Sequence, residues 1–167
     1  MAKLHIKPKS ITLRPIGKSD EPFLRKAYET SRDDELKDVV WNNPAERESF
    51  FRMQFDAQSL HYETFFGTAD FDIIEVEGKP AGRLIVSWND DHAVFIDIIL
   101  VPKYRKLGIA GSIMDALIKE VDRRGISASL SYEKWKPYLE KVYARYGFVT
   151  VNERPGHFVM ERPKKTK

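Results

Sequence analysis

Residues 95–121 read FIDIILVPKYRKLGIAGSIMDALIKEV, and their pattern predicts three successive elements. It begins with an apolar run, 95–101, that Pro102 ends, as expected of a buried strand. A basic turn containing two glycines follows over residues 103–112. The apolar residues after the turn recur with the spacing of one helical face; they are Ile109, Ile113, Ala116, Leu117 and Val121. We therefore predict a strand, a glycine-bearing turn and an amphipathic helix in direct succession.

The turn has the composition of an anion-binding loop. A helix that starts after such a turn presents backbone N–H groups that have no intrahelical partner. The small residues Gly108, Ala110 and Gly111 let a phosphate approach the main chain. Arg105 and Lys106 add positive charge just before them. Neither a GxxxxGK[ST] nor a GxGxxG motif occurs, so an ordinary strand-to-helix turn that uses glycine for its geometry stays open.

Composition restricts the kind of protein. With 42% hydrophobic and 32% charged residues, we expect one soluble domain over residues 1–167, with its core at 11–161 and tails at 1–10 and 162–167. A net charge of +3 is too small to indicate a nucleic-acid partner. There is no cysteine, and the four histidines have no metal-ligand spacing, so no metal site is expected. The sequence shows no signal peptide. It also has no apolar run that approaches the roughly 20 residues of a membrane helix. We therefore expect a cytoplasmic protein without a membrane partner.

Periodicity predicts further elements along the chain. Strands are expected at 11–16, 71–76, 81–88, 93–101, 127–131, 148–151 and 157–160, and helices from about residue 20, over 45–62, from the glycine turn to about 124, and over 135–146. The three consecutive strands in the middle suggest an antiparallel meander. The strand, helix and strand that follow predict a parallel crossover.

The predicted helix 45–62 has more aromatic residues than one face can bury. Phe50, Met53, Ala57 and Leu60 have helical spacing, and Phe51 and Phe55 lie beside them. Either these residues all pack in the core or some of them line a cleft. The acidic cluster that precedes this helix, residues 33–38, is interpreted as a solvated face or as the rim of a cleft for a cationic amine.

The stretch Arg105-x-x-Gly108-x-Ala110 resembles the coenzyme A pyrophosphate loop of the GCN5-related N-acetyltransferase (GNAT) superfamily, R/Q-x-x-G-x-G/A. The run VYARYGF at 142–148 is similar to that family's LYEKLGF ending, and MQFDAQ at 53–58 looks like a block of some small bacterial members. The predicted element order is also that of the GNAT fold. The resemblance implies an α/β (α+β) fold, with a mixed, mostly antiparallel sheet of about six to seven strands and about four flanking helices.

The resemblance further implies an acetyl-CoA-dependent N-acetyltransferase that acts on a primary amine of a small molecule or peptide. Because no cysteine is available for an acyl-enzyme, direct attack by the amine in a ternary complex is expected. A GNAT-fold protein that binds or senses acyl-CoA without catalysis is the alternative. The acceptor pocket is expected to be shaped by residues of about 20–66. Monomer and homodimer both stay open, with an exposed strand edge near the C-terminus available for a dimer.

The resemblance implies that backbone groups of one continuous stretch bind the acetyl donor, acetyl-CoA. Ile99, Leu100 and Val101 would run alongside the pantetheine arm, where the family has a bulge that separates two strands. The N–H groups of the next stretch would take the pyrophosphate; they belong to Lys106, Leu107, Gly108, Ile109, Ala110, Gly111 and Ser112. Arg105 and Lys106 would be the charge partners. Lys136 stands where the family often has asparagine, and it could reach a phosphate or simply be solvated.

Three residues are candidates for proton transfer. Tyr143 corresponds to the family tyrosine that protonates the leaving sulfur, and packing on the sheet is its alternative role. Asp97 lies within an apolar strand, at a position where several family members carry a glutamate that acts as the base and deprotonates the amine. It could equally be a core aspartate satisfied by backbone or hydroxyl groups. Glu133, just beyond the strand 127–131, is the second candidate for the base.

Overall fold

The computed structural model describes residues 4–8 and 10–165; residues 1–3, 9, 166 and 167 lie outside the described part. The predicted tails are therefore described only in part. The elements in chain order are β1 (Ile11–Pro15), η1 (Lys18–Asp20), α1 (Glu21–Ser31), α2 (Asp33–Leu36), α3 (Pro44–Phe66), β2 (Asp70–Val76), β3 (Lys79–Trp88), β4 (His92–Leu100), η2 (Pro102–Tyr104), α4 (Ile109–Arg124), β5 (Ser127–Glu133), α5 (Tyr138–Ala144), β6 (Val149–Arg154) and β7 (His157–Arg162).

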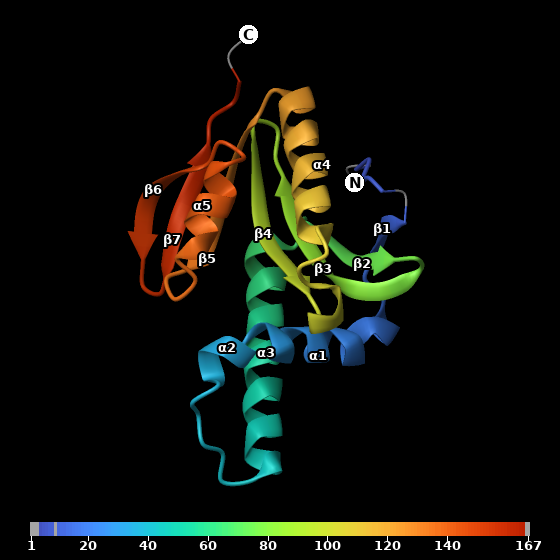
Figure 1. Cartoon of the computed structure of the whole chain (residues 1–167), viewed down its shortest axis with the longest axis vertical. Coiled ribbons are helices and arrows are strands. Elements are labelled where there is room, and N and C mark those ends of the chain that lie inside the picture. Colours follow the sequence, from blue (N-terminus) through green and yellow to red (C-terminus); the bar gives the residue numbers. More distant parts are fainter. Residues whose placement is uncertain (1–3, 9, 166–167) are drawn as a thin grey trace.

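The described strands form one sheet in the order β1-β2-β3-β4-β5-β7-β6. Every pairing is antiparallel except that of β4 with β5, which α4 connects as a crossover (Figure 1). The predicted meander and the predicted parallel crossover are thus both confirmed. The strand β6 lies at the edge of the sheet, and all six of its residues are exposed.

Two helical layers cover opposite faces of the sheet. Successive residues of a strand point to opposite faces, and β2 makes this visible at two fully buried neighbours. Ile74 belongs to the core that contains the buried face of α4, whereas Ile73 packs against α1 and α3. The N-terminal half of α3 extends beyond the sheet (Figure 1). The predicted face of α4 is confirmed, because its five apolar residues are at most 6% exposed.

The predicted face of α3 needs correction. Met53 and Leu60 are 60% and 65% exposed, whereas Phe51 and Phe55 are each 7% exposed. The helix carries apolar residues on several sides, so spacing alone permits more than one buried face. Phe51 and Phe55 are the buried residues because both of their rings pack edge to face against Tyr28 of α1.

The segment between β5 and β6 also differs from its prediction. The strand β5 continues to Glu133, which pairs with His157 of β7, so Glu133 lies within the strand and not beyond it. The helix α5 starts only after Pro137 and ends at Ala144, and is shorter than the predicted 135–146. Proline has no N–H to donate and favours the start of a helix. A four-residue helix, α2, occupies part of the acidic stretch, which was not predicted to be helical.

Two residues assigned to the tails are buried. Ile6 is 9% exposed and packs in the same core as α4, and Arg162 is 6% exposed. The packed part of the chain thus extends past the predicted limits of 11 and 161. Among the described residues, no helix is both long enough and apolar enough to cross a membrane.

Candidate functional site

The site lies where β4 and β5 separate. Their parallel pairing ends at Phe95 and Leu130, although β4 continues to Leu100 and β5 to Glu133. Between Ile85 and Val86 the register with β3 skips one residue of β4, Ile96, which forms a bulge. The bulge implied by the family resemblance is therefore present. The freed backbone of β4 beyond it faces the gap between the two strands.

The loop after β4 presents exposed backbone at the start of α4. Gly108, the N-cap of α4, has a φ of 78°, and no side chain caps the helix. Lys106 also has a positive φ, and residues 106–108 are all exposed. A Cβ added at Gly108 would meet no atom within 4 Å. The amides of the first turn of α4 are thus open to an anion, and the loop fits a pyrophosphate.

Arg105 has a different environment from the one predicted. Its Nε donates to the carbonyl of Leu100 at 2.8 Å, and its Nη2 donates to the carbonyl of Thr30 at 2.9 Å. The side chain therefore ties the loop to the end of β4 and to α1. The exposed Lys106 next to it carries no such bond among the described residues. A direct role of Arg105 as a phosphate partner stays a prediction.

Asp97 projects from β4 toward α3 and is bound by a guanidinium. The Nε and Nη2 of Arg83 lie 2.7 and 2.6 Å from the same oxygen, Oδ2 of Asp97. Burial raises the pKa of the Asp97 carboxyl, and the charge of Arg83 opposes this shift. The partner is a buried side chain of β3, and among the described residues neither a backbone group nor a hydroxyl bonds to this aspartate.

Glu133 and Lys136 lie close to Asp97. Lys136 Nζ is 3.2 Å from Glu133 Oε1, and the Lys136 amide donates to the Glu133 carbonyl. The charge of Glu133 acts on both Asp97 and Tyr143. Both candidate bases thus lie within electrostatic reach of the candidate acid.

Tyr143 of α5 is half-buried, with its ring against Tyr132 and Phe148. Burial raises the pKa of its hydroxyl to about 12, and the negative charges of Glu133 and Asp97 act in the same direction. The phenol therefore stays protonated at neutral pH, as a proton donor must. The structure brings together all three residues that were predicted for proton transfer.

Residues 24–148 match the model of the acetyltransferase (GNAT) family. The chain belongs to this family. The predicted family, fold class and enzyme class are thereby confirmed, and acetyl transfer is the activity of the class. No curated protein sequence matches the chain.

Solved GNAT structures share the fold at low sequence identity. PaiA N-acetyltransferase from Thermoplasma acidophilum, in complex with coenzyme A, is 18% identical over 92% of this chain and 99% of that one, with a TM-score of 0.68. A GNAT acetyltransferase from Elizabethkingia anophelis with acetyl-CoA bound is 11% identical over 93% and 99%, with a TM-score of 0.59. The ribosomal-protein-S18-alanine N-acetyltransferase from Escherichia coli is 17% identical over 94% and 96%, with a TM-score of 0.60.

Three residues of this GNAT site were missed by sequence reasoning. Arg83 of β3 donates to Gln58 Oε1 of α3 at 2.8 Å, and its guanidinium lies 5.7 Å from the ring centre of Tyr62. Burial raises the pKa of the Tyr62 hydroxyl, so this group is neutral. A signal was available: Arg83 stands alone in the apolar stretch 81–86, and Gln58 and Tyr62 are one helical turn apart.

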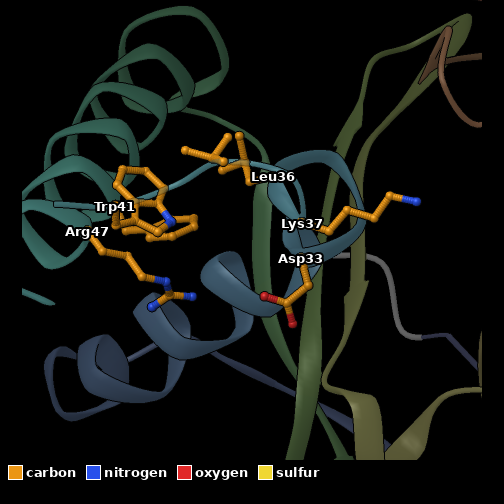
Figure 2. Close-up of a pocket in the computed structure, with 7 residues that line it drawn as sticks. Asp33, Leu36, Lys37, Trp41 and Arg47 are labelled. Atoms are coloured by element: carbon orange, nitrogen blue, oxygen red, sulfur yellow. The ribbon is translucent and has the colours of Figure 1, made fainter. Parts of the chain in front are cut away.

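A cavity of about 240 Å³ lies elsewhere, between α2 and the N-terminal half of α3 (Figure 2). Its lining includes Asp33, Lys37, Trp41, Arg47 and Phe51. Phe51 precedes Tyr62 by about 16 Å along the helix axis, at 1.5 Å per residue. The cavity is therefore apart from the site at Asp97. In the described part of the chain, no group of three or more His, Cys, Asp or Glu side chains could hold a metal ion.

Proposed function

We propose that the protein transfers the acetyl group of acetyl-CoA to a primary amine of a small molecule or peptide. The observation that carries this proposal is the separation of β4 from β5 beside an open helix N-terminus, with Asp97, Glu133 and Tyr143 within electrostatic reach of one another. Membership of the GNAT family supports the choice of donor.

In this proposal the donor is held mainly by backbone. The main chain of 99–101 runs alongside the pantetheine arm, and the amides of 106–111 bind the pyrophosphate. The predicted contact of the Ser112 amide is left out, because that amide donates to the Gly108 carbonyl. Lys106, with its exposed ammonium group, supplies charge there. Arg105 keeps the loop in place through its two carbonyl contacts. Lys136, just before α5, is a further basic residue that could reach a phosphate of the donor.

The chemical step is a direct attack within a ternary complex. The amine nitrogen attacks the thioester carbonyl carbon, a C–N bond forms, and the C–S bond breaks. A carboxylate takes the proton of the amine, and the hydroxyl of Tyr143 gives a proton to the leaving thiolate. Asp97 and Glu133 both remain candidates for the base. Comparing Asp97→Asn with Glu133→Gln would decide between them, because only the base should determine the acid limb of the pH profile.

The replacement Tyr143→Phe tests the proposal. Removing a positioned acid lowers turnover by about 100-fold or more, and acetyl-CoA affinity should stay the same because only one hydroxyl is lost. CoA release from a library of amines and calorimetric titration with acetyl-CoA measure the two quantities. Tyr146→Phe, one turn further along, is the matched control. Unchanged turnover in Tyr143→Phe would remove Tyr143 from the mechanism.

Binding of acetyl-CoA by the wild type without CoA release from any amine would instead support an acyl-CoA sensor. Absence of binding at millimolar ligand would leave the loop an ordinary turn, and the proposed function would be wrong.

A further inference from the structure

Arg83 is a buried charge whose presence needs a reason. It is only 4% exposed and lies in the middle of β3, opposite Ile73 of β2 and Ile99 of β4. An unpaired guanidinium in such surroundings is strongly disfavoured, and an apolar residue would pack there without that cost. Three charge-assisted contacts satisfy it, two from Asp97 and one from Gln58.

The contact between Arg83 and Asp97 uses only one carboxylate oxygen. Nε and Nη2 both reach Oδ2, which leaves Oδ1 without a hydrogen bond among the described residues. Gln58 takes a further N–H of Nη2 and thereby fixes the plane of the guanidinium. The side chain of Asp97 keeps 15% of its surface exposed. Its free oxygen is therefore available to a ligand or a water molecule.

We propose that Arg83 is a positioning residue for acetyl transfer, which holds Asp97 through one oxygen and leaves the other to receive the proton of the acceptor amine. Gln58 in turn holds Arg83. This inference rests on the proposed function and assigns the base to Asp97 over Glu133. It also gives a role to the 53–58 segment, whose last residue is Gln58.

The charges around Asp97 show why Arg83 is required. The negative charge of Glu133 on β5 disfavours the ionised form of Asp97. The positive charge of Lys136 favours that form, but Lys136 is itself paired with Glu133. Tyr62 of α3 and Tyr143 of α5 are neutral phenols. Without Arg83, burial and Glu133 would both favour the protonated form of Asp97, which cannot accept a proton.

The first test measures the carboxyl group itself, independently of turnover. In protein labelled with ¹³C at the aspartate carboxyl, the Asp97 signal is assigned by its loss in Asp97→Asn and followed against pH. We expect the titration midpoint to rise by roughly 1 pH unit or more in Arg83→Met. It should return toward the wild-type value in Arg83→Lys. Arg14→Met, which removes a paired arginine of β1, is the control and should leave the midpoint unchanged.

The second test follows activity once an amine acceptor has been found. The acid limb of kcat/KM should move to higher pH in Arg83→Met by the same amount as the carboxyl midpoint, with acetyl-CoA affinity retained. If Arg83→Met fails to fold, Gln58→Met and Arg83→Lys take its place, and both should give smaller shifts in the same direction.

The outcomes separate the two proposals. An unchanged Asp97 midpoint in folded variants overturns the inference, as does a moved midpoint with an unmoved acid limb; in both cases acetyl transfer by the wild type would still stand. A wild type that transfers acetyl to no amine overturns the proposed function, and the role of Arg83 in transfer falls with it.

Discussion

Two parts of the site are built in opposite ways. The loop region, residues 99–112, is one continuous stretch and offers mainly backbone groups. The ion-pair region consists of Gln58, Tyr62, Arg83 and Asp97, whose side chains come from α3, β3 and β4. A backbone site depends on the local conformation of the chain, which nearby residues determine. A side-chain site depends on how distant elements pack, so the two regions should respond differently to substitution.

The largest effect is expected at Gly82 of β3, which precedes Arg83 of the ion-pair region and pairs with Leu100 of the loop region. A Cβ there would lie 2.0 Å from the carbonyl oxygen of Ile99, which is a backbone atom of the paired strand β4 and cannot move aside as a flexible side chain can. Gly82→Val should therefore lower the free energy of unfolding by more than about 3 kcal/mol. Denaturant unfolding measures this. Gly78→Ala, in an open turn with a positive φ, is the control and should cost about 1–2 kcal/mol.

Next in size is the effect of Gly108→Val on the loop region. The added side chain meets no neighbour, but a β-branched residue strongly disfavours a φ of 78°. The loop should rearrange, and acetyl-CoA affinity should fall by about 10-fold or more, since 1.4 kcal/mol corresponds to a factor of 10. Calorimetric titration measures the affinity. Gly156→Val, which has the same φ in the β6–β7 turn, should leave it unchanged. Retained affinity in Gly108→Val would contradict a backbone donor site.

Arg105→Met distinguishes a loop anchor from a phosphate partner. As an anchor, Arg105 contributes two hydrogen bonds from a charged group to carbonyls, and its loss should lower the free energy of unfolding by about 1–3 kcal/mol. As a phosphate partner, its loss would instead weaken acetyl-CoA binding and reduce the salt dependence of that binding. Because the structure shows both carbonyl contacts, we expect the first result, which would count against the predicted phosphate contact of Arg105. Lys106→Met, in which an exposed ammonium is lost, should show the second one.

The smallest effect concerns a second arginine–aspartate pair, Arg14 with Asp20. Here hydrogen bonds from Arg14 and the Gly17 amide lower the pKa of Asp20 to about 2, whereas burial raises that of Asp97. Asp20 therefore stabilises the fold above pH 3.8, its ordinary pKa, and this stabilisation is lost as the pH falls through 2. Because Arg14 is 38% exposed, we expect only about 1 kcal/mol. Between pH 4 and 2, the free energy of unfolding should depend less on pH in Asp20→Asn than in the wild type. Equal slopes of this free energy against pH would contradict the lowered pKa of Asp20.

Much of the fold could be predicted because it depends on local pattern. The alternation of apolar runs with polar turns predicted the strands, and the spacing from Ile109 to Val121 predicted the buried face of α4. Between the predicted strands 71–76 and 81–88, Glu77 and Gly78 both have the positive φ of a tight hairpin. The face of α3 was not predictable, because that helix has several apolar sides and its partner, Tyr28, lies in another helix.

The sequence alone was enough to predict the glycine-bearing turn before α4, the order of the elements and the ending around Tyr143, since each depends on residues close together in the chain. Two contacts became evident only in the folded chain: Arg83 binds Asp97 and Arg105 donates to the carbonyl of Thr30, across 14 and 75 positions. The physical reason is that a buried charge must find its partner wherever packing brings one within hydrogen-bond distance. The number of residues between two side chains does not predict whether they will be neighbours once the sheet has formed.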